Sequence, residues 1–362
     1  WSGVVAACER VPICSLGGEG GLTGFGLRRW YLVAVRTWVI VAIASVGGID
    51  VISSARAAEA GSAAVVADRP LLGVSCGSAE ACTAVGGLFA ERWNGQRWSV
   101  RGVAIPAVSD TQRDFDGGIS CATRRMCMAV GTAYPALSAN VDYFYTALAE
   151  VWNGSSWSDQ SPGRGQTRNG FFQAVSCPSR SECIAVGQGG TSPLAMGWNG
   201  HRWRVQLAPV RTPVMSVLNG VSCRSASQCI AVGSLVQNQS SPARVLVERW
   251  NGAVWSTVHT PTTNPLENAM LNAVSCTGGS CIAVGSLGFR PLVERWNGRR
   301  WSIQRNPKRA PDGSLNGVSC VSPADCTAVG AQTNNTHQSV AERWTGGRWS
   351  IQRTPTPASG SI

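Results

Sequence analysis

Twelve of the fourteen cysteines occur as closely spaced pairs. The pairs are Cys76/Cys82, Cys121/Cys127, Cys177/Cys183, Cys223/Cys229, Cys276/Cys281 and Cys320/Cys326. Thiols at this spacing could form a disulfide across a hairpin turn or bind zinc. Zinc knuckles prefer about two to four intervening residues and need further ligands, so we predict six local disulfides, no metal ion and no cofactor.

Tyrosine is the second residue type with a suggestive distribution. Three of the four tyrosines, Tyr134, Tyr143 and Tyr145, lie between residues 132 and 146, and Arg113 and Asp116 precede that segment. Aromatic faces beside charged groups suit the recognition of a sugar or a peptide. We therefore take Arg113, Asp116, Tyr134, Tyr143 and Tyr145 as candidate ligand-binding residues. The alternative is that Tyr143-Phe144-Tyr145 extends the third strand of the repeat and packs between blades.

The cysteine pairs belong to a repeating unit that must position these residues. Each pair is followed by Ala-Val-Gly, then by Trp-Asn-Gly or Trp-Thr-Gly and a second tryptophan, so that twelve of the 15 tryptophans fall in six pairs. A repeat of this length is typical of propellers and solenoids. The repeats cover about residues 71–100, 117–159, 171–206, 217–258, 270–304 and 315–353.

One copy of the unit, residues 271–304, indicates four short strands. LNAVSC and CIAVGS are apolar runs of strand length, PLVERW is a third, and WSIQ returns after the turn signal Asn297-Gly298. Six such units predict an all-β fold, a six-bladed β-propeller of four-stranded antiparallel blades. An open solenoid is the competing architecture.

This strand order also predicts two different faces. The first–second and third–fourth turns share one face and are short and uniform. The second–third connections and the crossovers between blades share the other face and vary in length. Because variable loops on a rigid scaffold often carry binding sites, the tyrosine segment of the second repeat is the favoured site.

At these residues the chain resembles the kelch and galactose-oxidase type of propeller. Gly86-Gly87 matches the glycine doublet of a kelch unit, and the Gly-x-x-Trp of each tryptophan turn is shared with the Asp-box of sialidase-like propellers. The added cysteine pair resembles a feature of secreted bacterial repeat proteins. The resemblance covers residues 71–353 and implies the fold, whereas propellers host many functions.

The first 60 residues lie outside the repeats. We interpret residues 1–26 as an upstream region and residues 27–60 as an export signal, with Arg28-Arg29 before an apolar segment and small-residue cleavage sites near Ala57 and Ala60. An uncleaved anchor is the alternative. Residues 61–362 would then form the secreted or cell-envelope propeller, with no stable membrane span, and we expect a monomer.

Catalytic signatures are sparse. The histidines His201, His259 and His337 lie in different repeats, and His-Glu-x-x-His is absent from the sequence. We predict a non-catalytic module that binds a glycan or protein of the cell envelope through the variable loops. The alternative is a glycan-active hydrolase or lyase whose residues converge at the mouth of the central channel.

The net charge of +11 raises the question of an anionic partner. Many arginines, however, recur within the repeat. Arg92, Arg249, Arg295 and Arg343 precede the first tryptophan of a pair, and Arg97, Arg202, Arg300 and Arg348 precede the second. We expect such residues to stack on tryptophan or to pair with Glu91, Glu248, Glu294 and Glu342. No nucleic-acid partner is predicted, whereas an anionic glycan remains open.

Overall fold

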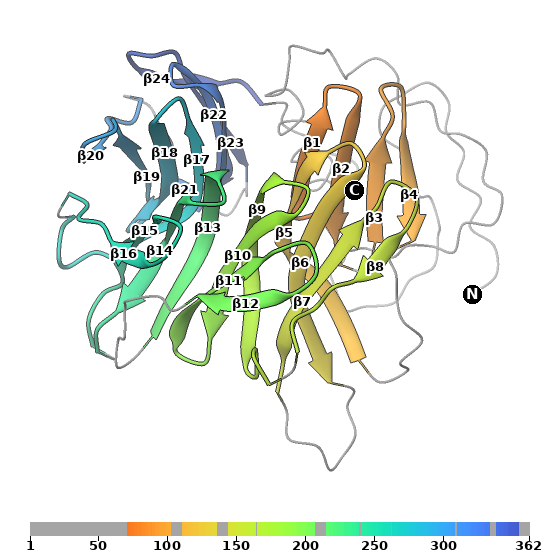
Figure 1. Cartoon of the computed structure of the whole chain (residues 1–362). Helices are drawn as coiled ribbons and strands as arrows, with labels where there is room; N and C mark the ends of the chain where they lie inside the picture. Colours follow the sequence, from red (N-terminus) through yellow and green to blue (C-terminus); the bar gives the residue numbers. More distant parts are fainter. Residues whose placement is uncertain are drawn as a thin grey trace, which may run out of the picture.

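The computed structural model describes residues 71–87, 89–102, 111–135, 144–163, 165–206, 215–238, 240–261, 263–307, 310–333 and 338–354. Within these residues, 24 strands form six four-stranded antiparallel sheets that follow one another around a ring, as predicted (Figure 1). None of the described segments is a helix long and apolar enough to cross a membrane. The interpreted upstream region and export signal lie outside the described residues.

Blades 1 to 3 are built from consecutive strands. Blade 1 contains β1 (Gly73–Ser78), β2 (Ala81–Gly86), β3 (Phe89–Trp93) and β4 (Trp98–Gly102). Blade 2 contains β5 (Thr111–Thr123), β6 (Met126–Pro135), β7 (Thr146–Trp152) and β8 (Trp157–Asp159). Blade 3 contains β9 (Gly170–Ser179), β10 (Glu182–Gly189), β11 (Ser192–Trp198) and β12 (Trp203–Gln206).

Blades 4 to 6 repeat this order. Blade 4 contains β13 (Met215–Ser225), β14 (Gln228–Val236), β15 (Arg244–Trp250) and β16 (Trp255–Thr257). Blade 5 contains β17 (Ala269–Thr277), β18 (Ser280–Leu287), β19 (Arg290–Trp296) and β20 (Trp301–Ile303). Blade 6 contains β21 (Gly313–Ser322), β22 (Asp325–Gln332), β23 (Ser339–Trp344) and β24 (Trp349–Gln352).

The Ala-Val-Gly motif occupies the second strand of each blade, where its side chains are largely buried. Its glycine has a steric cause. A β-carbon at Gly285 would collide with the backbone carbonyl oxygen of Met270 on the first strand, and the glycine of the motif in blades 2, 3, 4 and 6 faces a carbonyl in the same way. The first strand bulges at this point in blade 5. Glycine is therefore needed in this motif because the backbones of the first two strands lie too close together for a side chain to fit between them.

Each tryptophan pair flanks the turn between the third and fourth strands. In blade 5 the ring centroids of Trp296 and Trp301 are 5.8 Å apart. Gly298 between them has a positive φ of 92°, and the Asn297 side chain accepts a hydrogen bond from the Arg300 amide at 3.0 Å. Asparagine and glycine suit this turn because one bonds to the backbone and the other tolerates the left-handed conformation.

All six predicted disulfides are formed, each across the turn between the first two strands of one blade. They are Cys76–Cys82, Cys121–Cys127, Cys177–Cys183, Cys223–Cys229, Cys276–Cys281 and Cys320–Cys326. The two cysteines of a pair are direct cross-strand neighbours, with Cα atoms 3.9 to 4.0 Å apart. Disulfides persist in oxidising compartments, so their number indicates such an environment for this protein.

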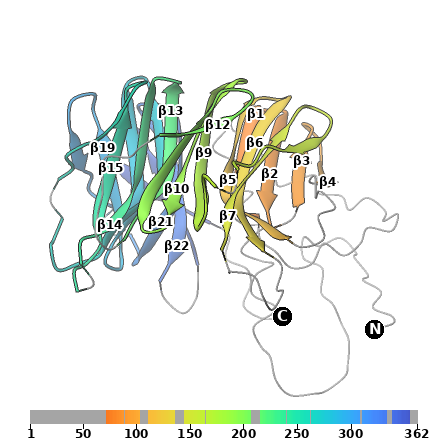
Figure 2. The same ribbon diagram turned by 60° about the horizontal axis from the view of Figure 1, so that its bottom comes forward.

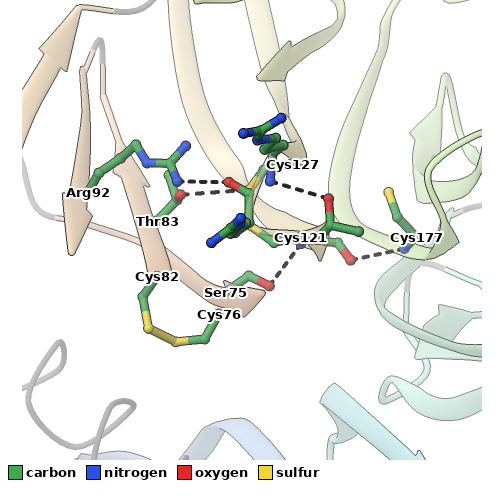
Figure 3. Close-up of a disulfide and its surroundings, with 12 residues drawn as sticks. Ser75, Cys76, Cys82, Thr83, Arg92, Cys121, Cys127 and Cys177 are labelled. Carbon is green, nitrogen blue, oxygen red and sulfur yellow. Dashed lines mark hydrogen bonds between the residues drawn. A yellow bond between two sulfur atoms is a disulfide. The ribbon is translucent and has the colours of Figure 1, made fainter. Parts of the chain in front are cut away.

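The second cysteine of each pair lies in the core, which excludes it from a surface site. Its exposed fraction is at most 4% in every blade, as found for Cys82, Cys127, Cys183, Cys229, Cys281 and Cys326. The sulfur of the blade 2 member lies 3.7 Å from the Thr83 hydroxyl of blade 1 (Figure 3). The members in blades 3, 4 and 6 belong to the apolar clusters between neighbouring blades. These cysteines therefore hold the blades together and offer nothing to a ligand.

The serine before the first cysteine of a blade bonds to the next blade. Ser75 Oγ accepts a hydrogen bond from the Cys121 amide at 2.9 Å, and Ser120 Oγ accepts one from the Cys177 amide at 2.9 Å (Figure 3). The same bond joins blades 3 to 4, 4 to 5 and 5 to 6. The disulfide end of five seams between blades is thus closed by one repeated hydrogen bond.

The opposite end of the same seams is closed by backbone hydrogen bonds. A carbonyl of the second–third connection accepts from the amide of a residue that opens the following blade. The bonds join Phe115 N to Gly87 O, Asn169 N to Tyr145 O, Ser216 N to Thr191 O, Ala269 N to Ala243 O and Gly313 N to Phe289 O. Between the two ends lie five apolar clusters, one in each seam.

The seam between blades 6 and 1 is packed less tightly. Trp98 and Val329 are half-buried, whereas the second tryptophan of every other blade is at most 5% exposed and Val284, the counterpart of Val329 in blade 5, is fully buried. Ser319, the counterpart of Ser75, is exposed. The ring therefore has one weak seam, at the point where the two ends of the repeat array meet.

We expect the seam between blades 6 and 1 to open first, and native-state hydrogen exchange should detect this opening. Amides of β1 and β21 should exchange faster than those of β9 and β13, because local opening starts where the fewest apolar contacts are broken. Native-state exchange followed by peptide mass spectrometry measures this directly. Faster exchange at the seam between blades 3 and 4 than at that between blades 6 and 1 would contradict the assignment.

Candidate binding site on the variable-loop face

The ring of blades has two faces. The turn face carries the disulfide turns and the tryptophan turns. The variable-loop face, at the other ends of the strands, carries the second–third connections and the crossovers. Figure 2 shows the strands of neighbouring blades side by side, with the connecting segments at their ends.

Three aromatic rings form a row on the variable-loop face, between blades 2 and 3. Tyr134 lies at the end of β6, and its ring centroid is 6.4 Å from that of Tyr145, just before β7. Tyr145 in turn lies 5.9 Å from Phe171 on β9. Tyr134 is 38% exposed, whereas Tyr145 and Phe171 are half-buried. The row thus presents one accessible ring supported by two that pack across the seam.

The backbone holds this row in place. Asn169, which precedes β9, adopts a positive φ of 54°, a conformation that asparagine tolerates better than most residues. Its amide donates to the Tyr145 carbonyl at 2.9 Å, and its own carbonyl accepts from the Gly190 amide at 2.8 Å. Phe171 is therefore brought against Tyr145 by a rigid junction between the two blades.

A carboxylate lies beside the exposed ring. The Thr132 hydroxyl is 3.0 Å from both Oδ1 and Oδ2 of Asp116 and donates its proton to this carboxylate. Burial raises the pKa of Asp116, and the nearby charge of Asp114 adds to the effect. Burial and the charge of Asp116 likewise raise the pKa of the Tyr134 hydroxyl. Since Thr132 supplies a single proton, Asp116 keeps acceptor capacity for other donors.

Arg113 lies on the other side of blade 2. It is opposite Ala133 in the register, and Ala133 packs in the cluster between blades 1 and 2. Thr132 is the next residue on β6 and therefore points with Asp116 toward blade 3. Arg113 donates instead to Asp159 at 2.7 Å and to the buried Glu150 at 3.5 Å. Arg113 therefore lies away from the row formed by Tyr134, Tyr145 and Phe171.

Arg113 and its carboxylate partners form a local ionic group. Burial alone would raise the pKa of Asp159, but hydrogen bonds from Ser161 and the ion pair with Arg113 lower it. The Arg113 side chain is 14% exposed. Arg113 therefore stabilises the start of blade 2, and we leave it out of the binding site.

The tyrosine segment is only partly an insertion. Tyr134 belongs to the second strand, because β6 continues to Pro135. Tyr145 packs across the seam, but the third strand, β7, begins only at Thr146. Tyr143 lies outside the described residues. The neighbouring Phe144 contacts Arg168, whose guanidinium carbon is 4.9 Å from the phenyl centroid.

Sequence reasoning missed Phe171 and Thr132. Phe172 takes the buried core position of the first strand that leucine fills in blades 4, 5 and 6, which leaves Phe171 on the opposite side of the strand. The doublet Phe171-Phe172 was the available signal, because only one of two adjacent strand residues can point into a given core.

The innermost strands carry amides near the central channel. Asn219 Nδ2 donates to the Leu271 carbonyl of the next blade at 3.0 Å, and Asn272 Nδ2 donates to the Leu315 carbonyl at 3.0 Å. These amides hold neighbouring blades together. In the described part of the chain, no group of three or more His, Cys, Asp or Glu side chains could hold a metal ion.

Two arginines of the repeat stack as expected. The guanidinium carbon of Arg92 is 4.6 Å from the centroid of Trp152, and that of Arg295 is 5.6 Å from the centroid of Trp344, each on the following blade. Pairing with the neighbouring glutamate is wrong for Arg343, which binds Asp325 at 3.1 Å. Adjacent strand residues point to opposite faces, and Glu294 and Glu342 are fully buried without a hydrogen-bond partner in the described structure.

No family model matches this chain, and no curated protein matches its sequence. Solved structures do resemble it. YjhT is 9% identical with a TM-score of 0.50, covering 78% of this chain and 98% of that one. YCF48 bound to D1 peptide is 13% identical with a TM-score of 0.49, covering 78% and 80%. The fucose-specific lectin from Aleuria aurantia is 12% identical with a TM-score of 0.48, covering 80% and 97%. At such identities the likeness concerns the fold alone.

Proposed function

We propose that this propeller is a secreted, non-catalytic binding module that recognises a glycan at the seam between blades 2 and 3. The observation that carries the proposal is the row Tyr134, Tyr145 and Phe171 on the variable-loop face, with the Asp116 carboxylate beside its exposed end. The six disulfides support an oxidising, extracellular location.

The chemistry of the row suits a sugar ring. A pyranose has an apolar C–H face that packs on an aromatic ring, and hydroxyls at its edge that need acceptors. Tyr134 offers the ring, and Asp116 offers oxygen lone pairs that Thr132 does not use. Because Tyr145 and Phe171 support Tyr134 from the seam with blade 3, the platform is preorganised and little side-chain entropy would be lost on binding.

A glycan array probed with wild type and with Tyr134→Ala tests this site. We expect the variant to lose about tenfold or more in apparent affinity for the oligosaccharides that wild type binds, which corresponds to about 1.4 kcal/mol. Tyr134 is the appropriate residue to change, since its ring is the most accessible of the three and its truncation leaves the contact between Tyr145 and Phe171 intact.

Phe289→Ala is the matched control. Phe289 is 74% exposed on the variable-loop face, but it belongs to blade 5. The Phe289→Ala substitution should therefore leave glycan binding unchanged. Equal binding by wild type and Tyr134→Ala, with both folded, would overturn the proposed site, and so would a loss in Phe289→Ala that matched the loss in Tyr134→Ala.

A further inference from the structure

Among the described residues, unpaired positive charge gathers on the turn face. The disulfide turns hold four exposed arginines, Arg124, Arg125, Arg180 and Arg224. The tryptophan turns hold five more, Arg97, Arg202, Arg299, Arg300 and Arg348. The same turns hold three acidic residues, Glu80, Glu182 and Asp325. Within the described residues none of these nine arginines forms an ion pair, whereas Asp325 already pairs with Arg343.

These arginines belong to one continuous surface. Within a blade, the glycine of the tryptophan turn packs on the disulfide turn, so that a β-carbon on Gly154 would lie 3.2 Å from Cγ of Arg125. Between blades, a β-carbon on Gly77 would contact the backbone of Thr123 and Arg124, and one on Gly278 would contact Pro323. The two rings of turns therefore pack against each other, and their side chains share one surface.

The densest part spans blades 4 and 5. A β-carbon on Gly279 would lie 3.9 Å from Nη1 of Arg224, and one on Gly298 would lie 3.6 Å from the Gly279 carbonyl oxygen. Arg299 and Arg300 directly follow Gly298 in the same turn. Arg224, Arg299 and Arg300 are thus neighbours on the surface, although 75 residues of sequence separate the first two.

The variable-loop face is different. Its described arginines are accompanied by a similar number of acidic groups, including Asp114, Asp116, Asp159, Glu267 and Asp312. Arg113 and Arg290 on that face are neutralised by ion pairs. The unpaired arginines of the turn face are therefore not explained by the general basicity of the chain.

We propose that the turn face is a second interaction surface and that it binds an anionic polysaccharide, a polymer that carries a carboxylate on many of its sugar units. Arginine presents a planar fork that matches a carboxylate, and a field of like charges on one face attracts a polyanion at long range. A protein with six disulfides functions where such polymers are found, and this favours them over nucleic acid.

This surface is independent of the glycan site on the other face. A multivalent polymer would contact several turns at once, and weak contacts with single arginines would then add up to useful affinity. Exposed ion pairs are screened by salt, so binding of the polysaccharide to the turn face should weaken strongly as ionic strength rises.

Binding to alginate, a polymer of uronic acids, tests the proposal. Wild type should bind alginate at low ionic strength, should be released at about 0.5 M salt, where screening acts over a few ångströms, and should not bind neutral dextran. The variant Arg224→Gln/Arg299→Gln/Arg300→Gln should bind alginate about tenfold more weakly or worse, since each exposed charge pair contributes modestly. Circular dichroism checks that the variant is folded.

The matched control is Arg244→Gln/Arg305→Gln/Arg353→Gln, which removes the same charge from exposed arginines at the other ends of the strands. It should change alginate affinity by no more than about twofold, which corresponds to a few tenths of a kcal/mol. The proposal is overturned if both triple variants weaken binding equally, if wild type does not bind alginate at low salt, or if a short duplex DNA binds more tightly than alginate under the same conditions.

Discussion

Replacing Gly285 by alanine should destabilise the protein by about 3 kcal/mol or more. A β-carbon there would overlap the carbonyl oxygen of Met270, and that carbonyl belongs to the backbone of the first strand of the same blade. Backbone inside a four-stranded sheet cannot move without breaking its own hydrogen bonds. The first strand would have to shift away from the second, together with the seam that it forms with blade 4.

Gly347→Ala is the control for this substitution. Gly347 lies in a tryptophan turn with open space around its Cα, so alanine should change the free energy of unfolding by less than about 0.5 kcal/mol. Chemical denaturation of the two variants and wild type gives both numbers. If Gly285→Ala were as stable as wild type, the close approach of the first two strands would be wrong.

Stability should fall as pH rises, because of carboxyl groups buried between blades. Burial raises the pKa of Glu294 to about 8 and that of Glu342 to about 7, from an ordinary value of 4.5. Below pH 4.5 both states are protonated and the folded state carries no penalty. Above pH 4.5, Glu294 and Glu342 lose their protons in the unfolded chain but keep them in the folded protein. Stability therefore falls progressively until the two folded carboxyl groups also ionise, near pH 7 to 8.

Glu294→Gln should remove much of this dependence. The amide has the shape of the protonated acid and cannot ionise, so the variant should exceed wild type in stability at about pH 8.5 and resemble it at about pH 5. Each unit of pKa shift corresponds to about 1.4 kcal/mol, and the difference at high pH should reach a few kcal/mol. Urea denaturation across this range measures it.

Glu267→Gln serves as the comparison. Glu267 accepts hydrogen bonds from Arg290 and Asn264, which lower its pKa, and it lies on the surface. Its replacement should leave the decline toward high pH in place. A wild-type protein that becomes more stable between about pH 5 and about pH 8.5 would show that Glu294 is not neutral in the folded state.

The fold could be predicted from sequence because its signals are local and repeated. The spacing of Cys276 and Cys281 defines a hairpin, and Asn297-Gly298 defines another, and both turns are found as predicted. The contacts between neighbouring blades were harder to predict from the sequence. The serine follows valine in five repeats and isoleucine in repeat 2, but its role depends on an amide about 45 to 57 residues further along the chain.

The site could be predicted only in part, for the same reason. Clustering in the sequence pointed to Tyr134 and Tyr145, and the structure brings these two rings together. The same clustering could not show that Arg113 and Asp116 both lie on β5 and point to opposite sides of blade 2, where they contact different partners. It also could not reveal Phe171, which reaches the row from another blade.

The proposed glycan site is tested most directly by a crystal structure with the neutral oligosaccharide that gives the strongest signal on the array. We predict a sugar ring packed on Tyr134, within about 4 Å of the aromatic face, with a hydroxyl bonded to Asp116. A sugar bound in the central channel or at blade 5, with Tyr134 uncovered, would contradict it.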